Sequence, residues 1–174
     1  GPMGDLRDRI RHDENALQKL MDKIPGFKGY HEQEIRRSAD KLLRDHLATM
    51  LEQVRQRLFR FQSELSSRGD FKPVTDLDRL TRRLVRAKDR LEHAPYGYAG
   101  FLDAAKIGVE GLDRIYDYDL ALRDTIAKID EAAATVTTAA QAQFDETLRL
   151  LDEEVEELSR MIDLRSEVAA DLTP

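Results

Sequence analysis

Apolar residues recur along most of the chain at steps of three and four, the spacing that lines one face of an α-helix. The longest run comprises Ile35, Ala39, Leu43, Leu47, Leu51, Val54, Leu58, Phe61 and Leu65. A second run comprises Leu77, Leu80, Leu84, Ala87, Leu91 and Ala94. Each run predicts a helix with one apolar face. At 1.5 Å per residue, the first helix would be about 50 Å long.

The second half of the chain repeats this pattern. One run comprises Leu112, Ile115, Leu122, Ile126, Ile129 and Ala133, and another comprises Phe144, Leu148, Leu151, Val155, Leu158 and Ile162. A short first helix is expected through Leu6, Ile10, Leu17 and Ile24. Short connections favour antiparallel neighbours with coiled-coil-like seams. We therefore expect an all-α fold, an elongated antiparallel bundle of four to five helices, forming a single domain over residues 1–174.

Proline and glycine mark three breaks between these helices, at residues 25–30, 67–74 and 95–100. After the second break, Thr75 is predicted to cap a basic helix over residues 75–94. Asp76 and Asp78 then lie in its first turn, where negative charge suits the helix dipole.

A fourth break is predicted near Thr135 to Thr138, although neither glycine nor proline occurs there. Thr138 is followed three residues later by Gln141, the pattern of a capping box. This pattern predicts an acidic final helix over residues 138–171. One unbroken helix through this point is the alternative interpretation.

Composition agrees with long helices that face solvent. Of the 174 residues, 36% are charged and only 6% are aromatic, and there is no cysteine. Disulfides and thiolate chemistry are thereby excluded. No stretch of about 18 apolar residues and no signal-type segment occurs, so we expect no transmembrane segment and a cytoplasmic location. Gly1 and Pro2 are interpreted as the remnant of an expression tag, with Met3 as the native start.

Charge is distributed unevenly along the chain. Residues 1–109 hold 22 Lys and Arg against 17 Asp and Glu, whereas residues 110–174 hold 6 against 17. On the basic helix, an arginine stripe lies opposite the leucines and comprises Arg79, Arg82, Arg83, Arg86 and Arg90. The acidic run comprises Asp152, Glu153, Glu154, Glu156 and Glu157. These faces either solvate the bundle, or pair with one another across it, or form a docking surface.

If the arginine stripe binds a partner, a protein is favoured, including another copy of the chain in a homo-oligomer. Nucleic acid is disfavoured because the chain is acidic overall and the arginines lack interleaved aromatic residues for base stacking. A membrane surface ranks between the two. Adsorption on a membrane would need bulky hydrophobic residues beside the basic face, and the basic helix does not have them there.

Seven of the eleven aromatic residues gather at two glycine-marked junctions: Phe27, Tyr30, Tyr96, Tyr98, Phe101, Tyr116 and Tyr118. Asp119 lies three residues before Leu122 and is therefore expected near the core, where a carboxylate needs a tyrosine hydroxyl or an arginine. These residues form either a packed bundle end or a recognition pocket. The candidate partner-binding residues of this region are Phe27, Tyr30, Tyr96, Tyr98, Phe101, Tyr116 and Asp119.

Known catalytic and metal-binding patterns are missing from the sequence. A di-iron bundle needs Glu-x-x-His pairs, and none occurs; His12, His31, His46 and His93 lie on separate elements or junctions. There is no phosphate-binding glycine loop, dinucleotide fingerprint or Gly-x-Ser-x-Gly elbow. We expect no catalytic residue, no metal and no cofactor.

Four strings carry a resemblance: Ile24 to Tyr30 (IPGFKGY), Arg36 to Leu47 (RRSADKLLRDHL), Tyr96 to Ile107 (YGYAGFLDAAKI) and Leu112 to Leu122 (LDRIYDYDLAL). They resemble those of small, uncharacterised all-helical bacterial proteins. The resemblance implies a bacterial cytosolic source and supplies no catalytic residue.

The sequence therefore predicts a non-enzymatic helical-bundle interaction or scaffold protein that self-associates. The first alternative is a stress-type adaptor that docks on an anionic membrane or nucleic acid through the arginine stripe. The second alternative is a bundle enzyme or ligand-binding protein that uses the region from Tyr96 to Asp119, which we call the Tyr/Asp junction.

Overall fold

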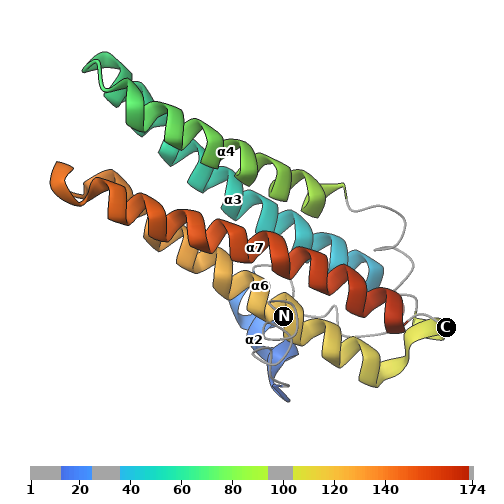
Figure 1. Cartoon of the computed structure of the whole chain (residues 1–174). Coiled ribbons are helices and arrows are strands. Elements are labelled where there is room, and N and C mark those ends of the chain that lie inside the picture. Colours follow the sequence, from blue (N-terminus) through green and yellow to red (C-terminus); the bar gives the residue numbers. More distant parts are fainter. Residues whose placement is uncertain (1–12, 25–35, 94–103, 173–174) are drawn as a thin grey trace.

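The computed structural model describes residues 13–24, 36–93 and 104–172, with side chains described except at 17, 36–41, 104–113 and 169–172. All regular structure in these ranges is helical (Figure 1). The elements are α2 (Ala16–Lys23), α3 (Arg36–Ser67), α4 (Phe71–Glu92), α6 (Ala104–Thr138), the 3₁₀ turn η2 (Gln141–Gln143) and α7 (Phe144–Leu172). The expected all-α fold is confirmed.

Two antiparallel hairpins form an elongated bundle (Figure 1). Helices α3 and α4 make one hairpin and α6 and α7 make the other; α3 packs on α6, and α4 packs on α7. Both hairpin turns lie at the same end, where the rings of Phe61 and Phe144 are 6.0 Å apart. Helix α2 packs on α6. The bundle therefore has an α3/α4 layer and an α6/α7 layer.

The predicted apolar faces form the core. The buried members of the predicted runs are Ile24, Leu43, Leu47, Leu51, Val54, Leu58, Leu65, Leu77, Leu80, Leu84, Ala87, Leu91, Ile115, Leu122, Ile126, Ile129, Ala133, Leu151, Val155, Leu158 and Ile162. Phe61, Phe144 and Leu148 are half-buried against them. The remaining run members, Leu6, Ile10, Leu17, Ile35, Ala39, Ala94 and Leu112, lie outside the described side chains.

The turn between α3 and α4 is shorter than predicted. Gly69 has a φ of 80° and ends α3; its amide donates to the Ser66 carbonyl and the Asp70 amide donates to the Leu65 carbonyl, a Schellman motif. Helix α4 then begins at Phe71, so the predicted start at Thr75 is wrong. Pro73 fits in the first turn because the amide that it lacks has no partner there.

The predicted break between the last two helices is confirmed, but its position and its cap are wrong. Helix α6 continues through Thr138, whose hydroxyl donates to the Ala134 carbonyl instead of capping the next helix. The chain turns at residues 139–140, and α7 begins at Phe144 after η2. The acidic helix therefore spans Phe144–Leu172 instead of residues 138–171. The alternative of one unbroken helix is excluded.

Among the described helices, none combines the length and the apolar character that crossing a membrane requires.

Candidate partner-binding groove

The outer side of the α3/α4 layer carries a groove of about 1030 Å³. Helices α3 and α4 turn their leucines inward, which leaves mainly polar residues outside. Phe59 is 59% exposed and Val85 is 37% exposed, and both line this groove. The other lining residues are Arg55, Gln62, Ser63, Ser66, Val74, Asp78, Arg79, Thr81, Arg82 and Arg86. The α3/α4 groove therefore combines an exposed aromatic ring with four arginines and one aspartate.

The arginines on the α4 side of the groove are accessible. The side chains of Arg79 and Arg82 are each 77% exposed, and their ion pairs within the described residues are with Asp76 at 3.5 Å and Asp78 at 3.0 Å. Exposed ion pairs of this kind contribute little free energy. Arg86 is exposed and makes no ion pair within the described residues. All three guanidinium groups can therefore be offered to a partner at small cost.

On the α3 side, Arg55 is held by Glu52, which accepts bonds of 2.9 Å and 2.6 Å from Nε and an Nη atom. Lys88 of α4 donates to the same carboxylate at 3.2 Å. The bonds from Arg55, followed by those from Lys88 and Gln56, lower the pKa of Glu52 from 4.5 to about 2 against the opposing effect of burial. This network fixes one edge of the groove.

The predicted arginine stripe divides between two roles. Arg83 pairs with Asp152, and Arg90 pairs with Asp163 at 2.6 Å, so both arginines join α4 to α7. Arg79, Arg82 and Arg86 face the α3/α4 groove instead. Pairing of the basic and acidic helices within one chain is thus confirmed for Arg83 and Arg90. Partner binding by the other three stays a prediction.

The N-terminal half of α7 carries an acidic surface around an exposed leucine. Leu150 is 46% exposed, and Glu146 and Glu153 flank it one turn away on either side. Both glutamates pair with Arg149, and all three side chains are more than half exposed. Glu154 lies on the α6 side of Leu150; burial raises its pKa, Glu157 and Glu153 raise it further, and Lys128 of α6 opposes them. We call Glu146, Leu150, Glu153, Glu154 and Glu157 the α7 acidic face.

The Tyr/Asp junction contains a buried ion pair. Asp119 of α6 is buried as predicted, and both of its carboxylate oxygens accept bonds from Arg165 of α7. The Arg165 side chain is only 1% exposed. One of the partners expected for this carboxylate, an arginine, is therefore the partner found.

Two tyrosines and a second aspartate are buried beside this pair. Tyr116 and Tyr118 are buried, and the Tyr118 hydroxyl forms no hydrogen bond within the described residues. Asp117 accepts a bond of 3.0 Å from the Asp13 amide, which ties the start of α2 to α6. The other candidates of this region, Phe27, Tyr30, Tyr96, Tyr98 and Phe101, lie outside the described residues. The described part of the junction is thus a packed polar core.

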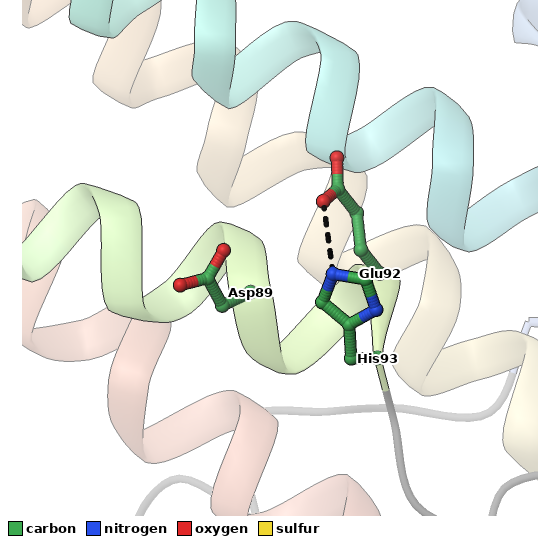
Figure 2. A group of neighbouring side chains, drawn as sticks. All are labelled: Asp89, Glu92 and His93. Carbon is green, nitrogen blue, oxygen red and sulfur yellow. Dashed lines mark ion pairs between the residues drawn. The ribbon is translucent and has the colours of Figure 1, made fainter.

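The described histidines are separate. His46 of α3 is half-buried; burial lowers its pKa and the charge of Arg123 lowers it further. His93 ends α4, where its Nε2 lies 3.6 Å from a carboxylate oxygen of Glu92 (Figure 2). Asp89 is one turn earlier, and the ligand atoms of these three residues lie within 4.8 Å of one another. The group is on an exposed turn and Glu92 also faces Lys88, so it resembles an ordinary surface charge cluster.

A second cavity of about 460 Å³ lies between the two hairpin turns. It is lined by half-buried Phe61 and Phe144 and by charged residues of both signs, including Glu64, Arg68 and Asp145. Four acidic and two basic residues line it, so its formal net charge is negative, opposite in sign to that of the α3/α4 groove.

Phe59, Val85, Leu150 and Arg165 were not among the residues that the sequence predicted to be functional. Phe59, Val85 and Leu150 fall outside the apolar runs, and their position off the runs is the signal that marks them as exposed. Arg165 lies three residues after Ile162, at a position that continues the apolar run. A charge at such a position indicates a buried ion pair.

No protein-family model matches the chain, and comparisons with curated proteins and with solved structures found no match. The resemblance to small bacterial helical proteins therefore stays a prediction, and the functional argument rests on geometry.

Proposed function

We propose that this protein is a non-enzymatic interaction module that self-associates through the α3/α4 groove. The observation that carries the proposal is the exposure of Phe59 and Val85 in a groove bordered by accessible arginines. Aromatic residues and arginine are enriched at protein interfaces, where they contribute most of the binding free energy. A groove between two helices also suits one face of a further helix.

The composition of the groove favours a protein over a polyanion. Arg83 and Arg90 are engaged with α7, which leaves three accessible arginines on α4 instead of a continuous basic stripe. Phe59 and Val85 line the groove together with these three arginines and Arg55. A protein surface can cover apolar groups and guanidinium groups together, whereas nucleic acid binding depends mainly on phosphate contacts.

The contacts within the Tyr/Asp junction support a structural role for this region. Asp119 is withdrawn from solvent and its two oxygens are engaged by Arg165. A carboxylate in this position stabilises the α6/α7 hairpin and is poorly placed to contact a substrate.

The proposal is tested by replacing both Phe59 and Val85 with Ser. Light scattering at a concentration where the wild-type chain exceeds its monomer mass should show the double variant as a monomer. Phe71→Ser is the matched control, because Phe71 is exposed but does not line the groove, and it should associate like the wild type. Association should persist, in weaker form, at about 0.5 M salt, where charge interactions are screened within a few Å.

Two outcomes would contradict the proposal. In one, the double variant associates as strongly as the wild type. In the other, the wild-type chain stays monomeric and binds anionic vesicles or duplex DNA, and Arg79→Glu with Arg82→Glu and Arg86→Glu abolishes that binding. The second outcome would support the adaptor alternative.

A further inference from the structure

We infer that the occupant of the α3/α4 groove is the α7 acidic face of a second copy, so that copies associate head to tail. This inference rests on the proposed function and extends it by naming the partner surface. The first support is charge complementarity, because the groove holds four arginines and one aspartate. The α7 acidic face holds four glutamates beside Arg149.

The second support is apolar complementarity. Phe59, Phe71, Val85 and Leu150 are the exposed large hydrophobic residues among the described side chains. Phe59 and Val85 line the groove, and Leu150 is at the centre of the α7 acidic face. A leucine flanked by carboxylates therefore matches a phenylalanine and a valine that share their groove with guanidinium groups.

The third support is the excess of carboxylates on α7. One oxygen of Glu154 is buried and accepts no hydrogen bond within the described residues. The charges of Glu157 and Glu153 add to the effect of burial and raise the pKa of Glu154, so this carboxylate is disfavoured in its charged form. Glu146 and Glu153 are more than half exposed, so these two carboxylates offer the charge of the face to a second copy.

The lengths of the two surfaces agree. The α7 acidic face runs from Glu146 to Glu157, which is about 17 Å at 1.5 Å per residue. Along α4, the groove runs from Val74 to Arg86, which is about 18 Å by the same rise. One face of α7 can therefore lie along the whole groove.

The position of the two surfaces decides the symmetry of the assembly. The groove is outside the α3/α4 layer, whereas the α7 acidic face belongs to the α6/α7 layer. On one side of α7, Asp152 and Asp163 form ion pairs with arginines of α4. On another side, the charge of Lys128 of α6 lowers the pKa of Glu154. Because the two surfaces lie on opposite layers, a pair of copies cannot use both contacts reciprocally. Such heterologous contacts leave a free groove and a free acidic face, so the assembly grows.

A mixing experiment tests this inference. The groove variant carries Arg79→Glu, Arg82→Glu and Arg86→Glu, and the face variant carries Glu146→Gln, Leu150→Ser and Glu153→Gln, so that the two mutated surfaces have no opposite charges to pair. Each variant alone should be monomeric, with association weakened at least tenfold. An equimolar mixture should give a species of twice the chain mass that does not grow, because the intact acidic face of the groove variant binds the intact groove of the face variant.

The matched control carries Arg60→Glu, Arg68→Glu and Lys72→Glu, which changes net charge as much as the groove variant does but at exposed positions outside the groove. It should associate like the wild type, which separates the local contact from general repulsion. Circular dichroism checks that each variant keeps its helices.

The inference is overturned if the mixture stays monomeric, or if the face variant alone associates like the wild type. If the groove variant is monomeric while the face variant associates, the proposed function stands and only the occupant is wrong. If the wild-type chain itself never associates, the proposed function fails together with this inference.

Discussion

Arg165 of α7 and Asp119 of α6 form a buried ion pair in which both carboxylate oxygens accept hydrogen bonds from the guanidinium group. The pair joins the two helices of one hairpin at the level of the buried residues Tyr116 and Tyr118. Because a lone buried charge is very unfavourable, each member depends on the other.

Removing one member of this pair should strongly destabilise the fold. Arg165→Met leaves the Asp119 carboxylate buried without its guanidinium partner, which should lower the free energy of unfolding by about 3–5 kcal/mol. Urea denaturation of the wild type, Arg165→Met and the double variant Asp119→Leu with Arg165→Met checks this. The double variant should recover most of the loss. If it is less stable than Arg165→Met alone, the pair is not the source of the effect.

Truncation of two neighbouring side chains on α3 should change the free energy of unfolding by very different amounts. Leu58 is fully buried, so Leu58→Ala should lower the free energy of unfolding by about 2–5 kcal/mol. Phe59 is largely exposed, so Phe59→Ala should change the stability of the monomer by about 0.5 kcal/mol or less. Both are measured by denaturation at a concentration where the chain is monomeric. Similar losses at the two positions would contradict the orientation of α3.

Glu52 should make stability depend on pH in the acid range. Its pKa in the folded chain is about 2, below the ordinary value of 4.5, so the ionised form stabilises the fold fully above about pH 4.5. This contribution is lost as the pH falls from there toward 2. Because Glu52 is partly exposed, we expect Glu52→Gln to cost about 1 kcal/mol at neutral pH and nearly nothing near pH 2.

The control for Glu52 is Glu64→Gln, since Glu64 is an exposed glutamate on the same helix with no ion pair in the described structure. Its effect should be small at every pH. A cost of Glu52→Gln that stays constant between pH 7 and acid would argue against the Arg55 and Lys88 network.

The core could be predicted from the sequence because helical periodicity is a local property. Spacing alone placed Leu47, Leu84, Ile126 and Val155 on buried faces, and it placed Asp119 near the core. Arg165 was not identified as its partner, because that pairing depends on how α6 and α7 align over the 46 residues that separate the two side chains.

The helix boundaries and the groove were harder to predict. Pro73 was expected to interrupt the helix, but a proline in the first turn loses no hydrogen bond, and α4 starts before it. The α3/α4 groove depends on which residues of two helices meet across a turn. Phe59 and Val85 are distant in sequence. A single exposed hydrophobic residue is common on protein surfaces and by itself does not predict a binding site.

The most direct test of self-association is sedimentation equilibrium of the wild-type chain over a range of concentrations. Protein concentrations between about 1 µM and 1 mM detect dissociation constants in the same range, which correspond to binding free energies of about −8 to −4 kcal/mol. We expect the weight-average mass to rise from the chain mass with increasing concentration and to pass the dimer mass without a plateau. A mass that stays at one chain over the whole range would contradict the proposal.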